Sequence, residues 1–474
     1  MVFPLIAELF RTKSVDQLKE TAEKRGLKKA LGPLDITLMG IGAIIGAGIF
    51  VLTGVAAANY AGPGIVLSFI ISAFACVLVA LIYSELASMV PVAGSTYTYT
   101  YAALGEVVAW VVGWDLILEY FFAVCMVSSG WSGYMVGIFR SAGIALPQYL
   151  AASPDAGGLI NVPAMFIPLL IGFLLIRGTK ESATVNRIIV FVKLAVIFIF
   201  IVLAVPKVDP ANWTPFLPYG FQGVMAGAAI IFTAFLGFDA MSTTAEESGN
   251  PGRDLPIGII GSLLICTALY VAVSGLLTGL VPYTELNNPE PVAYALSAVG
   301  YRLGSAIVAV GAIAGITTVL LVMMYGQTRI VFAMSRDGFL PDWVGRLHPK
   351  YGTPYMVTAV SAGAAAIVAG LVPIRILAEL VNIGTLFAFI LSAIGVFILR
   401  YKLPDLPRPF KAPAIHIVAP LAVIMCAVLM LMLPLATWVR FLLWFSFGLI
   451  IYFGYGYRHS RLSKEKAVEL VSKK

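Results

Sequence analysis

The stretch Gly40-Ile-Gly-Ala-Ile-Ile-Gly-Ala-Gly48 places four glycines within nine residues, near the middle of an apolar segment over 34–58. Each glycine costs a helix about 1 kcal/mol relative to alanine. Non-helical backbone at membrane depth survives only where protein buries it or where it lines a wet cavity. The stretch predicts a broken helix, whose free N–H groups suit a carboxylate and whose free carbonyls suit a cation. Close glycine packing between two helices is the alternative.

The composition around this stretch is that of a helical membrane protein. Of the 474 residues, 60% are hydrophobic and only 12% are charged, and the mean hydropathy is +0.95. Soluble domains carry about 25% charged residues, whereas apolar runs of about 20 residues recur along this chain. We therefore expect an all-α polytopic membrane protein, located in the cell membrane.

The apolar runs predict twelve transmembrane helices. Their expected limits are 34–58, 63–90, 105–136, 159–177, 183–205, 221–248, 256–281, 302–334, 355–373, 377–400, 413–435 and 437–458. An even number places both termini on one side. Basic clusters in the leader, in alternate loops and in the tail make that side cytoplasmic.

The same limits divide the chain into four regions. Residues 1–33 are mostly polar and predict a cytoplasmic leader, partly an amphipathic helix on the membrane surface, with no secretory signal. Residues 34–400 would form a ten-helix core and 401–458 two additional transmembrane helices. Residues 459–474 would form a basic cytoplasmic tail.

A second glycine-interrupted segment, Phe232-Thr-Ala-Phe-Leu-Gly-Phe-Asp239, lies in the sixth span. Spans one and six occupy corresponding positions if two five-span halves repeat. A pair of interrupted helices at matching positions points to a transporter binding site. An odd-numbered repeat must also be inverted, since span one leaves the cytoplasm and span six returns to it.

Ionisable residues at bilayer depth are costly and usually functional. Asp115 and Glu119 lie four residues apart on one face of span three. Asp115 could instead pair with a loop cation, and Glu119 could simply hydrogen-bond across helices. Glu85, nearer the end of span two, is interpreted as a structural or interfacial carboxylate.

Lys193 lies about halfway along span five, with about 10 helical residues on either side, too far for its side chain to reach an interface. Its amine therefore needs local acceptors or must be neutral part of the time. The carbonyls freed at the break in span one are the candidates. Asp239, beside the second break, is the runner-up proton carrier, or it packs the broken helix.

Other function classes find little support. The four cysteines are scattered in apolar runs and the three histidines are far apart, which predicts neither a disulfide framework nor a metal site. The net charge of +7 follows the loop topology and does not indicate nucleic acid. No nucleotide loop or nucleophile motif suggests an enzyme, no cofactor is expected, and neither a channel filter nor a receptor output domain is apparent.

Several motifs resemble the amino acid–polyamine–organocation superfamily, over nearly the whole chain. They are Gly40–Phe50, Ala61–Gly64, Val90–Tyr99, and Phe232–Ala240 running on to Pro256. The cationic amino acid transporter branch, with its bacterial members, is most similar at Leu27–Asp35, Gly113–Glu119 and Ser335–Pro341. Mammalian members of that branch often have fourteen spans, which puts a cationic preference in doubt here.

The resemblance implies a five-plus-five inverted repeat with discontinuous helices 1 and 6, and secondary active uptake of amino acids by alternating access. It also implies substrate-binding positions at both breaks and on two other helices. The N–H groups of Gly46, Ala47 and Gly48 would hold the substrate carboxylate, and the carbonyls of Ile44, Thr233 and Leu236 its α-amino group. Phe232 and Phe235 would gate the pocket, with Glu119 and Met323 near the substrate side chain.

Within the superfamily, sodium-coupled members bind a cation between spans one and eight, and members with a lysine in span five place its amine there instead. Lys193 therefore favours proton coupling without sodium, or sodium-independent exchange. The expected partners are protons, membrane lipids and cationic or small neutral L-amino acids. A small single-span membrane partner stays open. Exchangers that anchor a partner use an extracellular cysteine, which none of the four cysteines clearly provides.

Overall fold

The structure, a computed structural model, describes residues 11–12, 31–89, 96–97, 100–101, 104–178 and 183–461. Within these ranges every regular element is a helix, and the only β-type pairings are two isolated bridges. The all-helical class expected from the sequence is confirmed. Most of the predicted leader and tail, and part of the Val90–Tyr99 motif, lie outside the described residues.

In the part of the chain that the structure describes, eight helical stretches are long and apolar enough to cross a membrane. They are Gly48–Met89, Glu106–Ser141, Arg187–Lys207, Gly220–Ser242, Pro251–Leu280, Arg302–Arg336, Ile374–Lys402 and Leu435–His459. Four shorter apolar helices accompany them: Pro33–Ile44, Val162–Arg177, Tyr355–Leu371 and Ile415–Leu431. Together these helices occupy all twelve of the predicted apolar segments.

Apart from the short helix α8, which was not predicted, the elements of the first half follow the predicted limits to within a few residues, as far as the described ranges show. They are α3 (Pro33–Ile44), η1 (Gly48–Leu52), α4 (Thr53–Ala56), η2 (Ala57–Ala61), α5 (Ile65–Met89), α7 (Glu106–Ser141), α8 (Gln148–Ala151), α9 (Val162–Arg177) and α10 (Ala183–Ala204).

The elements of the second half begin with a helix that is broken in turn. They are α11 (Gly220–Ile231), η7 (Phe232–Phe235), η8 (Asp239–Glu247), α12 (Pro251–Leu280), α13 (Pro291–Ala298), α14 (Arg302–Arg336), α15 (Tyr355–Leu371) and α16 (Ile374–Lys402). The chain continues through α17 (Ile415–Leu431), α18 (Leu435–Ile451), η10 (Tyr452–Gly456) and α19 (Tyr457–His459).

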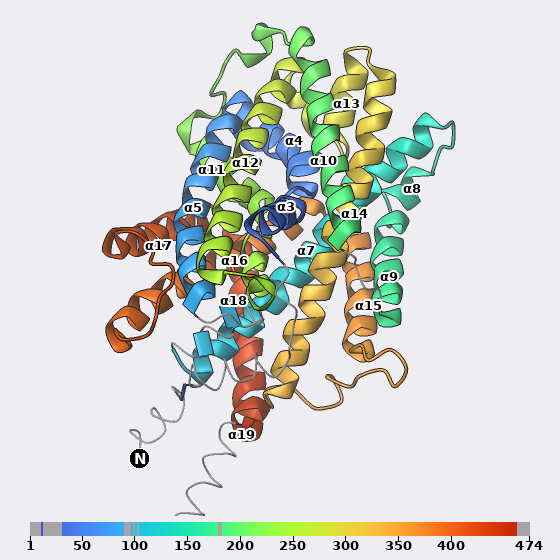
Figure 1. The fold of residues 1–474 in the computed structure, drawn as a ribbon. Helices are drawn as coiled ribbons and strands as arrows, with labels where there is room; N and C mark the ends of the chain where they lie inside the picture. The colour runs from blue at the N-terminus through green and yellow to red at the C-terminus, as the bar shows by residue number, and fades with distance from the viewer. Residues whose placement is uncertain are drawn as a thin grey trace, which may run out of the picture.

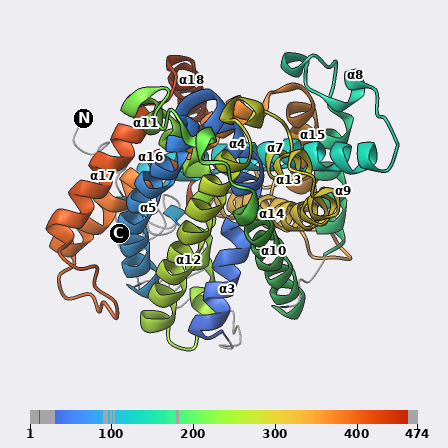
Figure 2. The same ribbon diagram turned by 90° about the horizontal axis from the view of Figure 1, so that it is seen from above.

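The broken helices lie at the centre of the molecule and the other helices surround them. Helix α3 packs against α12, α10 and α14, and the long helix α7 packs against α14 and α16. Helix α17 lies at one edge, whereas α9 and α15 pair at the opposite edge (Figures 1 and 2).

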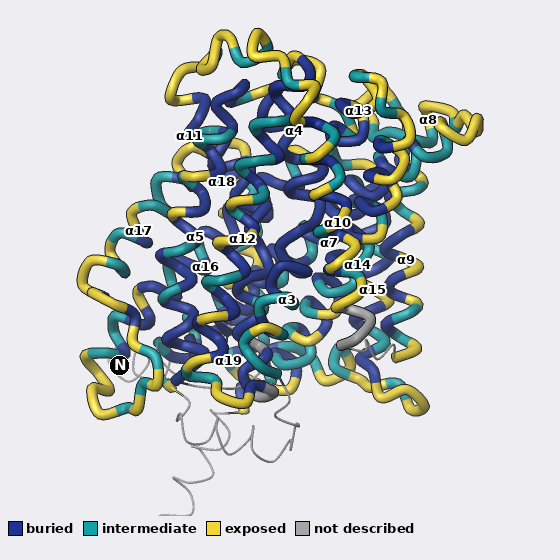
Figure 3. Tube along the Cα trace, turned by 45° about the horizontal axis from the view of Figure 1, so that its top comes forward, coloured by how far each residue is buried: buried dark blue, intermediate teal, exposed yellow. Residues whose placement is uncertain are grey.

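Burial follows this arrangement. Residues of the interrupted helices and of the inner faces of α5 and α7 are buried, and the exposed residues lie on loops and on the outer faces of peripheral helices (Figure 3). Many of the exposed residues are large and apolar, among them Phe166, Phe198, Leu264 and Leu443. An outward apolar surface of this kind is what a lipid environment selects.

Candidate functional site

The first helix breaks where the four-glycine stretch predicts. Helix α3 ends at Ile44, and Ile45 adopts an extended backbone (φ −72°, ψ 104°). The Ile45 N–H still donates to the Ile41 carbonyl, at 3.0 Å. The second half of the broken helix begins with a hydrogen bond from the Phe50 N–H to the Gly46 carbonyl, at 3.4 Å. The N–H groups of residues 46–48 therefore lie in the first turn of a new helix, where no preceding turn supplies carbonyl acceptors.

The glycines of this stretch also serve packing. A Cβ at Gly48 would lie 2.3 Å from the Cα of Ala234, so the two broken helices approach backbone to backbone here. A Cβ at Gly40 would lie 2.4 Å from the Ser262 hydroxyl oxygen on α12. The broken helix and the glycine packing, weighed above as alternatives, are therefore both present.

The second break lies between η7 and η8. Leu236 adopts an extended backbone (φ −58°, ψ 145°), and Gly237 has φ +108°, a conformation that favours glycine. The N–H of Gly237 donates to the Asp239 carboxylate at 3.1 Å. Asp239 therefore fixes the turn at this break, the packing role weighed for it above.

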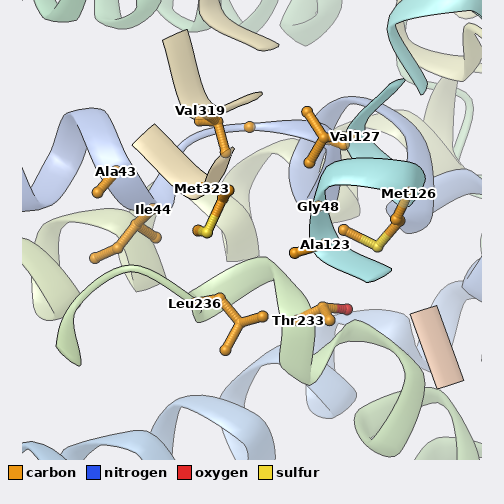
Figure 4. Close-up of a pocket in the computed structure, with 12 residues that line it drawn as sticks. Ala43, Ile44, Gly48, Ala123, Met126, Val127, Thr233, Leu236, Val319 and Met323 are labelled. Atoms are coloured by element: carbon orange, nitrogen blue, oxygen red, sulfur yellow. The ribbon is translucent and has the colours of Figure 1, made fainter. Parts of the chain in front are cut away.

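Both breaks open onto one pocket with about 300 Å³ of empty space, its mouth included (Figure 4). Residues of the two broken helices, of α7 and of α14 line it, and Figure 4 shows the Met323 side chain of α14 between the two breaks. The lining residues are Ala43, Ile44, Gly46, Ala47, Gly48, Ala123, Met126, Val127, Thr233, Leu236, Val319 and Met323.

Seven of the ten predicted substrate-binding residues line this pocket. The other three, Glu119, Phe232 and Phe235, do not. Phe235 packs against Phe69 and Tyr270, with ring centroids 6.1 and 5.3 Å away, and Phe232 packs against Phe389, at 6.0 Å. The gating role expected of the two phenylalanines stays a prediction.

Glu119 lies one helical turn from Ala123, which lines the pocket. Ala123, Met126 and Val127 follow Glu119 at intervals of four, seven and eight residues, and Val319 precedes Met323 by four. These residues were missed from the sequence, although helical spacing from Glu119 and Met323 identifies the faces on which they lie.

Lys193 reaches the first break from α10. Its side chain is only 1% exposed, and its amine donates to the carbonyls of Gly42, at 2.5 Å, and Ile45, at 2.9 Å. Two carbonyls on opposite sides of the last residue of α3 thus share one amine. Lys193 therefore holds the backbone on both sides of the end of α3.

Tyr270 of α12, which the sequence did not single out, joins the two breaks. Its hydroxyl lies 2.9 Å from the Ile44 carbonyl and 3.0 Å from the Ala234 carbonyl, and the side chain is fully buried. A hydroxyl has one proton and can donate to one of the two carbonyls at a time. Tyr270 therefore positions Ile44, a predicted acceptor for the substrate's α-amino group.

Glu85 shows the structural role weighed for it. Its fully buried carboxylate accepts hydrogen bonds from Nε and Nη2 of Arg400, at 2.9 and 2.6 Å, and from the N–H of Ala412, at 2.8 Å. The Arg408 Nε lies 3.5 Å away. Glu85 thus ties α5 to the connection between α16 and α17, away from the pocket.

A short segment before α13 covers the other end of the first broken helix. A Cβ at Gly133 would lie 2.5 Å from the Pro289 side chain, and a Cβ at Gly137 would lie 1.8 Å from the Glu290 carboxylate. A Cβ at Gly54 would likewise lie 2.5 Å from the Pro291 side chain. Three glycines on α7 and α4 therefore form the surface on which this segment docks.

Comparisons with known proteins identify the family of this chain. The amino acid permease family matches the chain over residues 31–455. The branched-chain amino acid permease BcaP of Bacillus subtilis is 50% identical over 462 residues, which are 96% of this chain and 99% of that protein. The methylthioribose transporter of the same organism is 43% identical over 461 residues, 97% of this chain and 100% of that protein.

Plant relatives share a somewhat smaller region. The chloroplastic cationic amino acid transporter 9 of Arabidopsis thaliana is 39% identical over 381 residues, 79% of this chain and 67% of that protein. The family match covers both breaks and every residue that lines the pocket. The chain therefore belongs to the amino acid permease family, whose members are transporters and not enzymes.

Proposed function

We propose that this protein is a secondary active transporter that takes up amino acids across the cell membrane by alternating access. Its twelve helical segments would all cross the membrane as a five-plus-five inverted repeat with two additional helices, and both termini would be cytoplasmic. One observation carries the proposal: two interrupted helices present two kinds of backbone end, N–H groups and carbonyls, to a single pocket.

This pair of backbone ends matches both charged ends of an amino acid. The N–H groups at Gly46, Ala47 and Gly48 begin a helix, where the helix dipole favours a carboxylate. The carbonyls of Ile44, Thr233 and Leu236 would accept from the α-ammonium, which has three donors. Thr233 O already accepts from the N–H of Leu236, at 3.2 Å, but a carbonyl has a second lone pair.

The rest of the pocket favours a small neutral side chain. Ala123, Met126, Val127, Val319 and Met323 contribute apolar atoms, and Figure 4 shows them facing the two breaks from α7 and α14. A long cationic side chain would have to extend a further turn to reach Glu119. Branched-chain and cationic amino acids, named for the relatives, are therefore secondary candidates.

We propose that protons drive uptake through Lys193 and that sodium is not needed. Its ammonium satisfies two carbonyls at the first break, and a neutral amine would hold them less strongly. Loading and release of the proton would thus favour different shapes of the first broken helix. Exchange of one amino acid for another is the alternative, because the same pocket would serve both.

A ligand panel tests whether the pocket binds both the carboxylate and the ammonium group of an amino acid. The purified protein is heated with L-alanine, with propionate and with ethylamine, and the shift of its unfolding temperature is measured. A ligand at 100 times its Kd stabilises the folded state by about 2.7 kcal/mol. We expect alanine to stabilise and the two half-molecules not to.

The same assay compares amino acids with different side chains, and it also tests methylthioribose, for which one relative is named. Valine, leucine, arginine, lysine and methylthioribose extend the panel. Stabilisation by methylthioribose and by no amino acid would contradict the proposal, since that sugar has neither a carboxylate nor an ammonium. Stronger stabilisation by arginine than by alanine would overturn the small neutral preference alone.

A further inference from the structure

A buried carboxyl group outside the pocket has no role in the mechanism so far. Asp115 of α7 is 0% exposed, and neither of its carboxyl oxygens has a hydrogen-bond partner among the residues that the structure describes. A Cβ at Gly384 of α16 would lie 3.0 Å from Oδ1, so the carboxyl group packs directly against the backbone of that helix. An ionised carboxylate in such a place would lack both water and a donor.

Two further carboxyl groups adjoin it. Glu119 lies one turn along the same face of α7, near the Thr385 hydroxyl, and interacts electrostatically with both Asp115 and Asp239. Asp239 stands at the second break, bonded to the N–H of Gly237. The three carboxyl groups thus run from the second break into the interface between α7 and α16.

Among the residues that the structure describes, no Lys, Arg or His forms an ion pair with Asp115, Glu119 or Asp239. Two buried tyrosines, Tyr83 of α5 and Tyr120 of α7, lie within electrostatic range of Asp239 and Glu119. Three adjacent carboxylates without a cation cannot all be ionised at bilayer depth.

We infer that Asp115 is a proton-binding site, and that Asp115, Glu119 and Asp239 form a relay that holds protons between the second break and the interface of α7 and α16. A proton passes from the acid form of Glu119 to the carboxylate form of Asp115. The transfer leaves Glu119 as the carboxylate and Asp115 as the acid.

The direction of the relay follows from the order of residues on α7. Ala123 lines the pocket, Glu119 lies one turn away from it and Asp115 two turns away. The use of the relay in transport rests on the proposed proton-driven uptake, whereas the protonation of Asp115 does not rest on it.

Infrared spectroscopy tests the protonation by itself. A protonated carboxylic acid has a carbonyl stretch that a carboxylate or a cation-bound carboxylate lacks, and the band shifts in D₂O. We expect the full-length protein at neutral pH to show such a band and Asp115→Asn to lose it. Asp342→Asn, which removes an exposed carboxylate, is the matched control and should keep it. A spectrum unchanged by Asp115→Asn would overturn the inference.

A second variant covers the case in which Asp115→Asn fails to fold. Gly384→Ala places a methyl group against Oδ1 and should shift the frequency of the same band without removing it. A band at an unchanged frequency in Gly384→Ala would equally contradict the assignment.

Transport separates the relay from the proposed function. In proteoliposomes, Asp115→Asn should lose the acceleration of uptake by an inward proton gradient, yet keep substrate-induced stabilisation and amino acid exchange, because Asp115 does not line the pocket. Retained acceleration would exclude the relay. If the wild-type protein itself shows no acceleration, proton-driven uptake fails, and the infrared result still decides the protonation of Asp115.

Discussion

At the scale of single residues, Gly46 and Gly48 differ in what lies next to them. The nearest neighbour of Gly46 is a side chain that lines the pocket, and that of Gly48 is the backbone of the other broken helix. A Cβ at Gly46 would lie 3.0 Å from a methyl group of Val319, a side chain that lines the pocket. A Cβ at Gly48 would lie 2.3 Å from the backbone of Ala234. The first neighbour can move by a few tenths of an ångström, and the second cannot move without shifting a helix.

The two alanine variants should therefore fail in different ways. Gly46→Ala should fold and bind alanine about tenfold more weakly, the equivalent of about 1.4 kcal/mol. Gly48→Ala should lose about 1–3 kcal/mol of folding stability through overpacking. Thermal unfolding with and without alanine measures both quantities. Equal loss of stability in the two variants would show that Gly46 also serves packing.

Tyr270→Phe tests how the two breaks are held together. The phenylalanine ring keeps the contacts with Phe69 and Phe235, but the carbonyls of Ile44 and Ala234 lose a shared donor. A buried polar group left unpaired costs about 1–3 kcal/mol. Because Ile44 is expected to contact the α-amino group, affinity should fall by a similar factor for alanine, valine and leucine. A loss that depends on the side chain would instead place Tyr270 near the far end of the substrate.

The sequence predicts more of the break than of the pocket. Free backbone groups are local consequences of Gly46 and Gly237, and they can be read from glycine spacing. The positions of Val127 and Val319 depend on which faces of α7 and α14 turn inward, which only packing decides. Glu119 is an example: its charge at mid-span is conspicuous, but Ala123, one turn away, lines the pocket.

At the scale of elements, hydropathy locates helices better than their polar ends. Helix α12 begins at Pro251, five residues before the predicted limit of 256, because its first turn contains Arg253 and Asp254. Asp254 accepts from the N–H of Asn250 at 2.9 Å and so stabilises that polar turn. Helix α13, only eight residues long, lies in the connection between α12 and α14 and was not predicted.

The segment before α13 should respond to pH. Burial raises the pKa of Glu290 from its ordinary 4.5 to about 7, with Arg140 acting in the opposite sense. Tyr134 of α7 lies within electrostatic range of the same carboxyl group. A raised pKa means that the docked segment binds more protons than the undocked one. Docking is therefore most stable below pH 4.5 and loses stability as the pH rises through about 7.

Hydrogen exchange of residues 286–298 measures this docking. After correction for intrinsic exchange rates, the segment should open more readily at pH 8 than at pH 5.5. Glu290→Gln should remove most of the difference, and Asp155→Asn, which changes an exposed carboxylate, should keep it. A pH dependence that persists in Glu290→Gln would assign the effect to another group.

At the scale of the whole molecule, two broken helices with a buried lysine beside one of them define the proposed carrier. Lys193→Ala removes the donor to Gly42 and Ile45 but none of the residues that line the pocket. We expect it to retain substrate-induced stabilisation, at least in part, and to lose proton-driven accumulation. If Lys193→Ala still concentrates substrate, the coupling proton binds elsewhere, and Asp239→Asn is the variant to compare.

The overall architecture was largely predictable because lipid imposes it. Apolar length sets the spans and loop charge sets the expected orientation, whereas the contact of Lys193 with the first break required the packing of α10 on α3. The sequence indicated that such an amine needs acceptors, and the structure shows which carbonyls these are.

Concentrative uptake in sodium-free proteoliposomes tests the central claim most directly. Vesicles containing the purified protein receive radiolabelled L-alanine with an inward proton gradient and no sodium on either side, and protein-free vesicles and vesicles without a gradient serve as controls. The account predicts that alanine accumulates above its external concentration only with protein and gradient together. Accumulation that requires sodium, or uptake no greater than in protein-free vesicles, would contradict it.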